Sequence, residues 1–269
     1  MQICTIVNHI SKTVNSTMNI SLQNKVVLVT GASQGIGAAI AIAMGESGAT
    51  VAIQYNRNEK GAKLVAQEIG DNAAIFQADF SNPKSVVQLY ETVFSKYKKI
   101  DVLVNNAGIA IETADDAPDE DWLFAFQKTL NVNLVATALL CKKAIADFKQ
   151  QESGIIINIT SRAALRGDTP EYLAYAASKG GMMSLTRSIA RMYGKSGITA
   201  FDVAPGFTKT AMAQQFIDEY GEDYAKQGIA LNRLTEPTDI APIVVFLASG
   251  LATHATGTTI HVNAASYVH

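Results

Sequence analysis

Short apolar runs recur along the chain and are separated by longer segments in which polar and apolar residues mix. The first run, Val26–Val29, has no polar alternation, which is typical of a strand covered on both faces. Further strands are predicted at Thr50–Tyr55, Ala73–Ala78, Ile100–Val104, Gly154–Ile159, Ile198–Val203 and Thr258–Val262. The segments between them predict helices, of which Asp119–Gln151 is the longest. This alternation predicts an α/β fold, with a Rossmann-like doubly wound parallel sheet of about seven strands and helices on both faces.

The length of the chain fits one domain, because 269 residues are ordinary for a single doubly wound unit. Met18 opens the segment that leads into the first strand, so residues 18–269 are predicted to form a single Rossmann-fold domain. Residues 1–17 do not continue the pattern. Their apolar run, Ile3–Val7, is too short for a signal peptide and has no basic residue before it. They are predicted to be an N-terminal extension or tail.

Charge and cysteine content narrow the classes of function. A net charge of −2 gives no electrostatic case for nucleic acid or for an anionic membrane. Cys4 and Cys141 show no metal-binding or redox spacing, so we expect no metal site and a reducing, cytoplasmic setting. No uninterrupted apolar run comes near a membrane span; the longest candidate lies around Ile243–Leu251.

The first predicted strand breaks at a glycine-rich turn, Thr30–Gly37, and a helix of small and apolar residues follows. Strand, glycine turn and helix N-terminus together form an anion site, because free backbone N–H groups and the helix dipole point at one place. Glycines let the backbone approach a pyrophosphate closely. Candidate cofactor-binding residues here are Gly31, Ser33, Gln34, Gly35, Ile36 and Gly37.

The same letters allow a second interpretation. Gly31–Gly35 also matches G-x-S-x-G, the nucleophile elbow of α/β-hydrolases, with Ser33 as the nucleophile. The hydrolase hypothesis needs a histidine that follows Ser33 in the chain. Apart from the terminal His269, only His254 and His261 do so.

The residues at the end of the second strand indicate which cofactor, NAD or NADP, the chain prefers. Enzymes that prefer NAD place an acidic residue about 20 residues past the glycines, on the ribose 2′-hydroxyl. This chain has Tyr55-Asn56-Arg57 there, with no carboxylate to repel a 2′-phosphate and an arginine able to pair with one. Asn56 and Arg57 are therefore candidate cofactor residues and NADP(H) is favoured over NAD(H); the alternative is a solvated loop arginine.

Further candidates follow the next strands. Asp79-Phe80 ends the third strand, where the carboxylate could accept from an adenine amine or else cap the next helix. Asn106, Ala107 and Gly108 follow the fourth strand and leave room for a cofactor over its end. Asn133 lies inside a mostly apolar helix, which suggests a buried hydrogen-bonding task; Asn131 is expected at the surface.

A serine, a tyrosine and a lysine form the last constellation. Ser161 ends the fifth strand, and Tyr175 and Lys179 stand one turn apart on the following helix. A lysine ammonium beside a tyrosine, together with an oxidised nicotinamide, stabilises the phenolate and lowers its pKa from about 10.

These motifs together resemble the short-chain dehydrogenase/reductase family over about Lys25–Val262. The resemblance rests on TGxxxGxG at Thr30–Gly37, NNAG at Asn105–Gly108, the run Asn131–Leu134, and a serine followed by YxxxK. It implies a catalytic set of Asn133, Ser161, Tyr175 and Lys179, and nicotinamide contacts from Pro205, Gly206, Thr208 and Thr210. It also implies a substrate lid near residues 207–234.

The chain departs from the family pattern at two places. The distance from Ser161 to Tyr175 is one residue longer than is common, so the loop between them is expected to carry an insertion and Thr160 stays an alternative to Ser161. Ala264-Ala265 stand where relatives carry Gly-Gly after the last strand, so the C-terminal contact is expected to differ.

The resemblance implies an NADP-dependent carbonyl reductase similar to 3-oxoacyl-[acyl-carrier-protein] reductases of fatty acid biosynthesis. A dehydrogenase of small alcohols, sugars or steroids is the alternative, and a serine hydrolase or a non-catalytic nucleotide sensor are more distant ones. Relatives pair through two helices, which implies a homotetramer. Arg187, Arg191 and Lys195 recur every four residues and could meet an acidic acyl carrier protein or simply form a solvated face.

Overall fold

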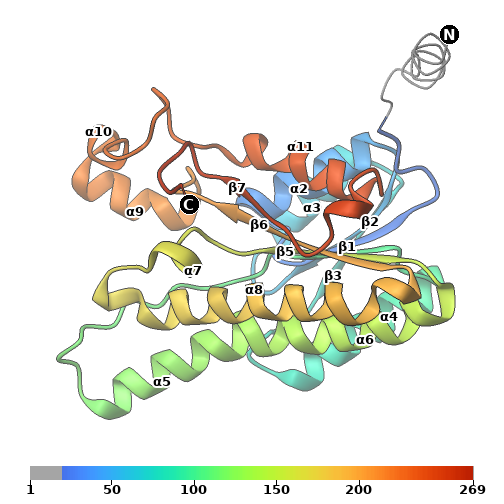
Figure 1. Cartoon of the computed structure of the whole chain (residues 1–269), viewed down its shortest axis with the longest axis horizontal. Helices are drawn as coiled ribbons and strands as arrows, with labels where there is room; N and C mark the ends of the chain where they lie inside the picture. Colours follow the sequence, from blue (N-terminus) through green and yellow to red (C-terminus); the bar gives the residue numbers. More distant parts are fainter. Residues whose placement is uncertain (1–19, 269) are drawn as a thin grey trace, which may run out of the picture.

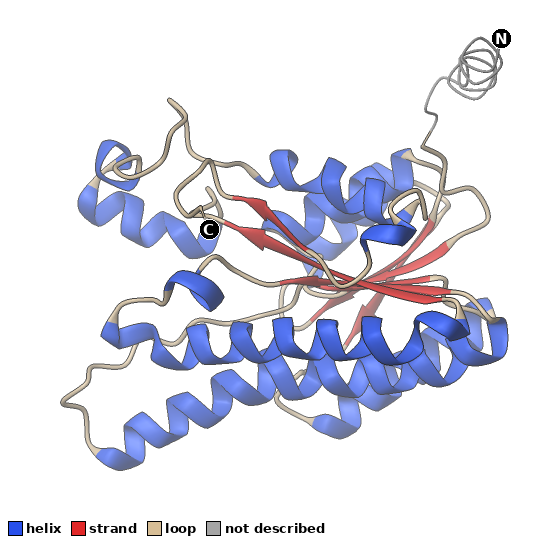
Figure 2. Ribbon diagram, in the orientation of Figure 1, coloured by secondary structure: helices blue, strands red, loops and turns tan. Residues whose placement is uncertain are grey.

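Seven parallel strands form one sheet in the computed structural model, which describes residues 20–268 (Figures 1 and 2). The predicted tail, residues 1–17, lies outside the described residues. The strands are β1 Val26–Val29, β2 Thr50–Tyr55, β3 Ala73–Gln77, β4 Val102–Asn105, β5 Gly154–Ile159, β6 Ile198–Pro205 and β7 Thr259–Val262. Their order across the sheet is β3-β2-β1-β4-β5-β6-β7. The predicted doubly wound α/β fold is therefore confirmed.

Helices cover both faces of this sheet, as Figures 1 and 2 show. Above it in Figure 1 lie α2 Gly35–Glu46, α3 Glu59–Ile69 and α11 Pro237–Ala248. Below it lie α4 Pro83–Tyr97, α5 Asp119–Leu130, α6 Ala136–Gln151 and α8 Leu173–Tyr193. Short helices α7 Ala163–Arg166, α9 Ala211–Tyr220 and α10 Glu222–Ala225 lie at one end.

The strand residues alternate between two cores, because successive side chains point to opposite faces of a strand. Val27 and Val29 of β1 pack with Ile40 and Met44 of α2, in the core beneath α2 and α11. Leu28 joins the second core, on the face of α4, α6 and α8. Both cores are apolar, which explains why the strands lack polar alternation in the sequence.

One long helical stretch, Asp119–Gln151, carries α5 and α6 with a π-helical turn, Asn131–Val135, between them. By length and composition alone it is apolar enough to cross a membrane. The expectation from the sequence concerned apolar runs, and charged and polar residues interrupt this stretch. The apolar residues of α6, among them Leu140 and Phe148, pack beneath the sheet.

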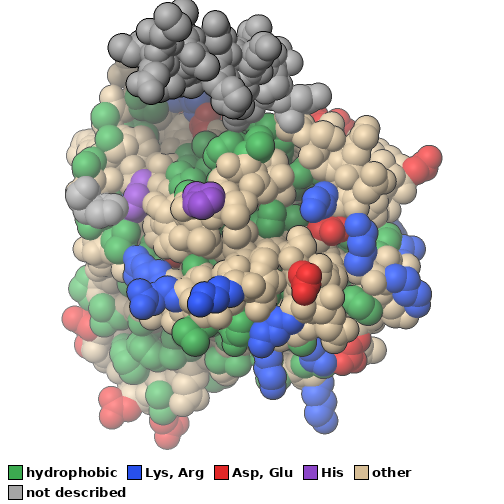
Figure 3. All heavy atoms as spheres, turned by 45° about the vertical axis from the view of Figure 1, so that its right-hand side comes forward, with side chains coloured by type: hydrophobic (Ala, Val, Ile, Leu, Met, Phe, Trp, Pro, Cys, Tyr) green, Lys and Arg blue, Asp and Glu red, His purple; other side chains and the backbone are tan. Residues whose placement is uncertain are grey.

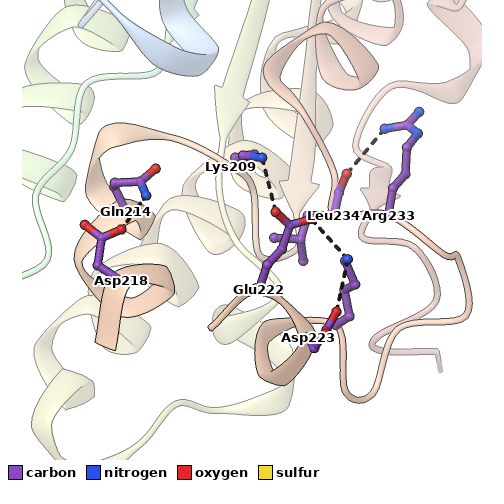
Figure 4. A network of polar contacts seen from close by, with 8 residues as sticks. Lys209, Gln214, Asp218, Glu222, Asp223, Arg233 and Leu234 are labelled. Atoms are coloured by element: carbon purple, nitrogen blue, oxygen red, sulfur yellow. Dashed lines mark hydrogen bonds and ion pairs between the residues drawn. The ribbon is translucent and has the colours of Figure 1, made fainter. Parts of the chain in front are cut away.

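The segment predicted as a lid contains α9 and α10, which lie together at the left of Figure 1. Figure 4 shows its polar contacts, in which Glu222 accepts from Lys209 at 3.2 Å and from Lys226 at 3.2 Å. These side chains are partly exposed to solvent. Elsewhere on the surface, the face in Figure 3 carries basic side chains in several groups, separated by neutral and apolar surface.

Candidate active site

Partly buried hydrogen bonds connect the glycine turn after β1 to the end of β4. The Thr30 hydroxyl accepts from the backbone N–H of Asn106 at 2.9 Å and of Ala107 at 3.0 Å. In return, Asn106 Nδ2 donates to the carbonyls of Thr30 at 2.9 Å and Gly31 at 3.1 Å. The TGxxxGxG and NNAG segments therefore form one rigid unit, although they lie some 75 residues apart.

Two glycines of the turn are required by close approach and backbone conformation. Gly31 has φ +62°, and a Cβ there would lie 2.8 Å from Ala107 Cα. A Cβ on Gly37 would overlap the Gly31 carbonyl oxygen. Gln34, the N-cap residue of α2, makes no capping bond with its side chain. The first N–H groups of α2 therefore remain available to an anion, and the turn fits a dinucleotide pyrophosphate.

Gln54 and Asn58 support this cradle, and the sequence analysis did not single them out. Gln54, only 2% exposed in β2, accepts from Gly31 N at 2.7 Å and donates to Ala78 O at 2.8 Å. Asn58 caps α3 through Gly61 N and donates to Gln34 Oε1 at 3.0 Å. A polar residue inside an apolar strand was the available signal for Gln54.

At the predicted adenosine end, Asn56 and Arg57 are exposed after β2. Asp79 accepts from the N–H and the hydroxyl of Ser81 at 2.9 and 2.8 Å. These bonds, with a smaller contribution from the Arg57 charge, lower the pKa of Asp79. The alternative prediction was that Asp79 caps the next helix. Asp79 does not, because Asn82 caps α4. The Phe80 side chain packs in the core, so only its backbone faces this end.

The structure distinguishes Ser161 from Thr160 after β5. Thr160 is 3% exposed and its hydroxyl donates to the Val203 carbonyl at 3.1 Å. Ser161 is half-buried, accepts from Ala163 N at 3.1 Å, and acts on the Tyr175 phenol by hydrogen bonding. The serine hydroxyl is thus the one that faces the tyrosine. The longer Ser161–Tyr175 connection holds α7 and a 3-10 turn, Pro170–Tyr172.

Tyr175 and Lys179 lie together at the start of α8. The Lys179 Nζ donates to Ile159 O at 2.8 Å and stands 5.8 Å from the Tyr175 ring centroid. Burial lowers the pKa of Lys179 to about 8, whereas the charge of Asp202 acts to raise it. Burial also raises the pKa of Tyr175 above its usual value, partly offset by the Ser161 hydrogen bond. The expected lowering of the phenol pKa is therefore not a property of the protein alone.

Asn133 occupies the π-helical turn, and such turns are frequent at functional sites. Its side chain exchanges two hydrogen bonds with the Ile109 backbone, at 2.8 and 2.9 Å, and donates to Ser178 Oγ at 3.0 Å. Ser178 in turn donates to the Tyr175 carbonyl at 2.7 Å. Asn133 is fully buried, whereas Asn131 is exposed as expected.

Gly108 keeps space open between two members of the predicted catalytic set. A Cβ there would lie 3.3 Å from Asn133 Oδ1 and 3.4 Å from Lys179 Nζ. The asparagine amide and the lysine ammonium therefore border the same small volume beside the end of β4.

The predicted nicotinamide-side residues lie at the end of β6 and in the loop that follows it. Gly206 lies against Asn263, whose Cα would be 2.8 Å from an added Cβ. Thr208 is 6% exposed and its hydroxyl donates to Gly206 O at 3.0 Å, so this side chain braces its own loop. Thr210 precedes α9 and its methyl group faces Gly35, which places the start of the lid over the glycine turn.

The hydrolase alternative lacks its geometry. Ser33 follows β1, whereas His261 lies on β7, four strand positions away and hence about 19 Å across the sheet. His254 lies in the connection that leads into β7. Within residues 20–268, no three His, Cys, Asp or Glu side chains gather as they would around a metal ion.

Comparison with known proteins places these features in a family. A family profile described as enoyl-(acyl carrier protein) reductase matches residues 31–264. A 3-oxoacyl-[acyl-carrier-protein] reductase of Staphylococcus epidermidis is 37% identical over 252 residues, which are 91% of this chain and all of that protein. A short-chain dehydrogenase/reductase structure from Mycobacterium marinum superimposes with TM-score 0.86 at 28% identity, over 93% of this chain and 98% of that one.

The chain belongs to the short-chain dehydrogenase/reductase family. It is accordingly an NAD(P)-dependent oxidoreductase. A further solved member is the 3-ketoacyl-(acyl-carrier-protein) reductase of Brucella melitensis, complexed with NADH. It superimposes with TM-score 0.83 at 31% identity, over 92% of this chain and 100% of that one.

Proposed function

We propose that the chain is an NADP(H)-dependent reductase of 3-oxoacyl thioesters. One observation carries this proposal: the Ser161 hydroxyl, the Tyr175 phenol and the Lys179 ammonium lie close together. They lie beside the glycine turn Gly31–Gly37, which is called the glycine cradle below. The printed activity of the Staphylococcus epidermidis and Brucella melitensis relatives supports the thioester as substrate.

The nicotinamide supplies the hydride, and the protein supplies position and charge. Gly31–Gly37, Asn106–Gly108 and the loop Pro205–Thr210 would hold the dinucleotide. Ser161 holds the carbonyl oxygen and Tyr175 gives it a proton, which suits a phenol whose raised pKa keeps it protonated at neutral pH. Lys179 and Asn133 border the space beside Gly108 through which the proton is replaced.

The substrate is tested with a panel of 3-oxoacyl thioesters, sugars, small alcohols and steroids, following the absorbance of reduced nicotinamide. We expect the highest kcat/KM with a thioester. Tyr175→Phe serves as the chemical control: it should retain cofactor affinity and lose kcat by about 10² or more, since the ring stays and the proton donor is removed. A panel in which a sugar or steroid exceeds every thioester would overturn the substrate assignment.

The preference for NADP(H) is proposed from the exposed Arg57, whose charge acts on Asp79 at the adenosine end. Arg57→Ala should weaken NADPH binding about tenfold or more and leave NADH nearly unchanged, because only NADPH carries a 2′-phosphate. A second variant should add a carboxylate at Asn56, which is exposed, and not at Tyr55, which is 7% exposed and would bury the charge. Equal binding of both nucleotides by the unaltered protein would contradict this preference.

A homotetramer and a carrier-protein partner complete the proposal. Leu123 and Phe124 of α5 are 49% and 64% exposed, and Met192 of α8 is 73% exposed, which suits pairing through these helices. The exposed Arg187, Arg191 and Lys195 suit an acidic carrier. Light scattering that gives a monomer at micromolar concentration would contradict the tetramer. A cytoplasmic setting is proposed because the one described cysteine, Cys141, is a buried free thiol.

A further inference from the structure

A row of buried polar side chains crosses the sheet on the face that α6 and α8 cover. Asn105 of β4, Asn158 of β5, Asp202 of β6 and Thr259 of β7 occupy registered positions on neighbouring strands. Registered residues of parallel strands share one face of the sheet, so these four side chains form a continuous line. This polar row lies between strand residues that are otherwise apolar.

Asp202 supplies the carboxylate of the polar row and is fully buried. Its Oδ1 accepts from the Thr186 hydroxyl of α8 at 2.6 Å, and its Oδ2 lies 3.4 Å from the Thr259 hydroxyl. Asn158 Nδ2 donates to the same Thr186 oxygen at 2.7 Å. A buried carboxylate with few donors is costly unless a charge of opposite sign lies near.

The Thr186 hydroxyl can serve either protonation state of Asp202. Its single proton has two acceptors, Asp202 Oδ1 at 2.6 Å and Met182 O at 3.0 Å. When the carboxylate is ionised, the proton points to it. When Asp202 carries a proton, Asp202 donates to the Thr186 oxygen and the hydroxyl turns to Met182. Asp202 can therefore titrate without leaving a buried polar atom unpaired.

Lys179 carries the charge of opposite sign to that of Asp202. It lies seven residues before Thr186 on α8, or about two turns, and reaches the sheet at Ile159, next to Asn158. Met182 lies between the charges, with its sulfur 3.7 Å from Lys179 Nζ and its carbonyl on Thr186. Asp202 raises the pKa of Lys179, and Lys179 lowers that of Asp202.

Burial opposes both charges and dominates both titrations. It brings the pKa of Lys179 down to about 8 and that of Asp202 up to about 7. The other groups that act on Asp202 are the exposed Arg187 of α8, which lowers its pKa, and the two threonine hydroxyls. On α6, the Cys141 thiol is itself affected by Asp202, whose charge helps to raise its pKa.

We propose that Asp202 is a positioning residue for Lys179: its buried carboxylate supplies the negative charge that keeps the lysine in the ammonium form beside Tyr175. The inference rests on the role proposed above for Lys179. The charge relation itself, however, is a property of the chain and is measurable without substrate or cofactor.

The direct test is a titration of Lys179 by NMR with 13Cε-labelled lysine, in which Lys179→Arg identifies the signal. The wild-type midpoint should lie at about pH 8. Asp202→Asn, which keeps the shape and removes the charge, should lower it by about one pH unit. The matched control is Asp101→Asn, which removes a carboxylate just before the amino-terminal end of β4, two strands away from β6. It should leave the midpoint unchanged, and an unmoved midpoint in Asp202→Asn would overturn the proposal.

A reciprocal measurement keeps the proposal testable if Asp202→Asn does not fold. In Lys179→Met, the midpoint of 13Cγ-labelled Asp202 should rise above about 7, because the lysine charge that lowers it is gone. An unchanged Asp202 midpoint in that variant would equally overturn the proposal.

The activity readout separates this inference from the proposed function. At about pH 6, Lys179 is protonated in both proteins, so the kcat of Asp202→Asn should stay near that of the wild type. Above pH 8, the fraction of Lys179 that is still protonated is about ten times smaller in the variant, so its kcat should be about tenfold lower. A purely structural role would lower activity by the same factor at every pH. If the wild type reduces no 3-oxoacyl thioester but the midpoints move, the substrate assignment fails and the charge relation stands. If the wild type is active and no midpoint moves, only Asp202 is wrongly assigned.

Discussion

The glycine cradle and the lid differ in how they are held. In the cradle, side chains such as Thr30 and Gln54, 1% and 2% exposed, bond to backbone groups of other strands. In the lid, Glu222 pairs with lysines whose side chains are 29% and 45% exposed. Exposed pairs contribute about 0–1 kcal/mol, whereas a lost partner of a buried N–H costs about 1–3 kcal/mol. The cradle is thus held by buried polar contacts, while the predicted lid is held by weaker contacts at the surface.

The largest expected effect comes from filling the cradle. Gly37→Ala should lower NADPH affinity by about 10² or more and destabilise the fold by about 2–4 kcal/mol, because its Cβ overlaps the Gly31 carbonyl. Nucleotide titration and thermal unfolding measure the two effects.

The matched control is another helical glycine with room around it. A Cβ on Gly180 in α8 would have its nearest neighbour at 3.8 Å. Gly180→Ala should therefore keep NADPH binding and not lower the melting temperature. Equal losses in both variants would show that the clash at Gly37 does not govern the cradle.

How far the sequence predicts this structure depends on how local the signal is. The glycine turn and the pairing of Tyr175 with Lys179 follow from residues next to each other in the chain or on one helix turn. Gln54 could not be assigned in the same way, because its partners lie 23 and 24 residues away and are brought together only by strand pairing. The burial of Tyr55 and the π-helical turn at Asn133 likewise depend on tertiary packing.

The next effect concerns the hydroxyl that joins the two signature segments. Thr30→Val keeps the shape of the side chain but leaves the N–H groups of Asn106 and Ala107 without their acceptor. We expect a loss of about 2–4 kcal/mol in the free energy of unfolding. Chemical denaturation measures it, and a change below about 1 kcal/mol would remove the distinction between cradle and lid.

A smaller effect is expected in the lid. Glu222→Gln removes the charge that pairs with Lys209 and Lys226, both of them partly exposed. The free energy of unfolding should fall by less than about 1 kcal/mol. The KM of the thioester substrate should change by a few-fold while NADPH affinity stays constant, if residues 207–234 act as the substrate lid that the family resemblance implies. A change in NADPH affinity as large as that of the substrate KM would contradict this division.

The smallest effect lies after β7, at the turn where the family resemblance implies Gly-Gly. Ala264 and Ala265 have φ of +50° and +58°, so the turn keeps the left-handed conformation that glycine favours although alanine fills it. The Ala264 carbonyl accepts from Ala230 N at 2.8 Å, which joins the turn to the end of the lid beside a cleft of about 290 Å³.

Left-handed backbone costs an alanine about 1–2 kcal/mol, and glycine loses about 0.5–1 kcal/mol to chain entropy. Ala264→Gly should therefore stabilise the protein slightly, by about 0.5 kcal/mol, measured as a small rise in melting temperature. Ala248→Gly, within helix α11, is the opposite control and should destabilise, since glycine there gains no relief of strain. A lower melting temperature in Ala264→Gly would mean that the turn carries no strain, and that the alanines hold the end of the lid by packing.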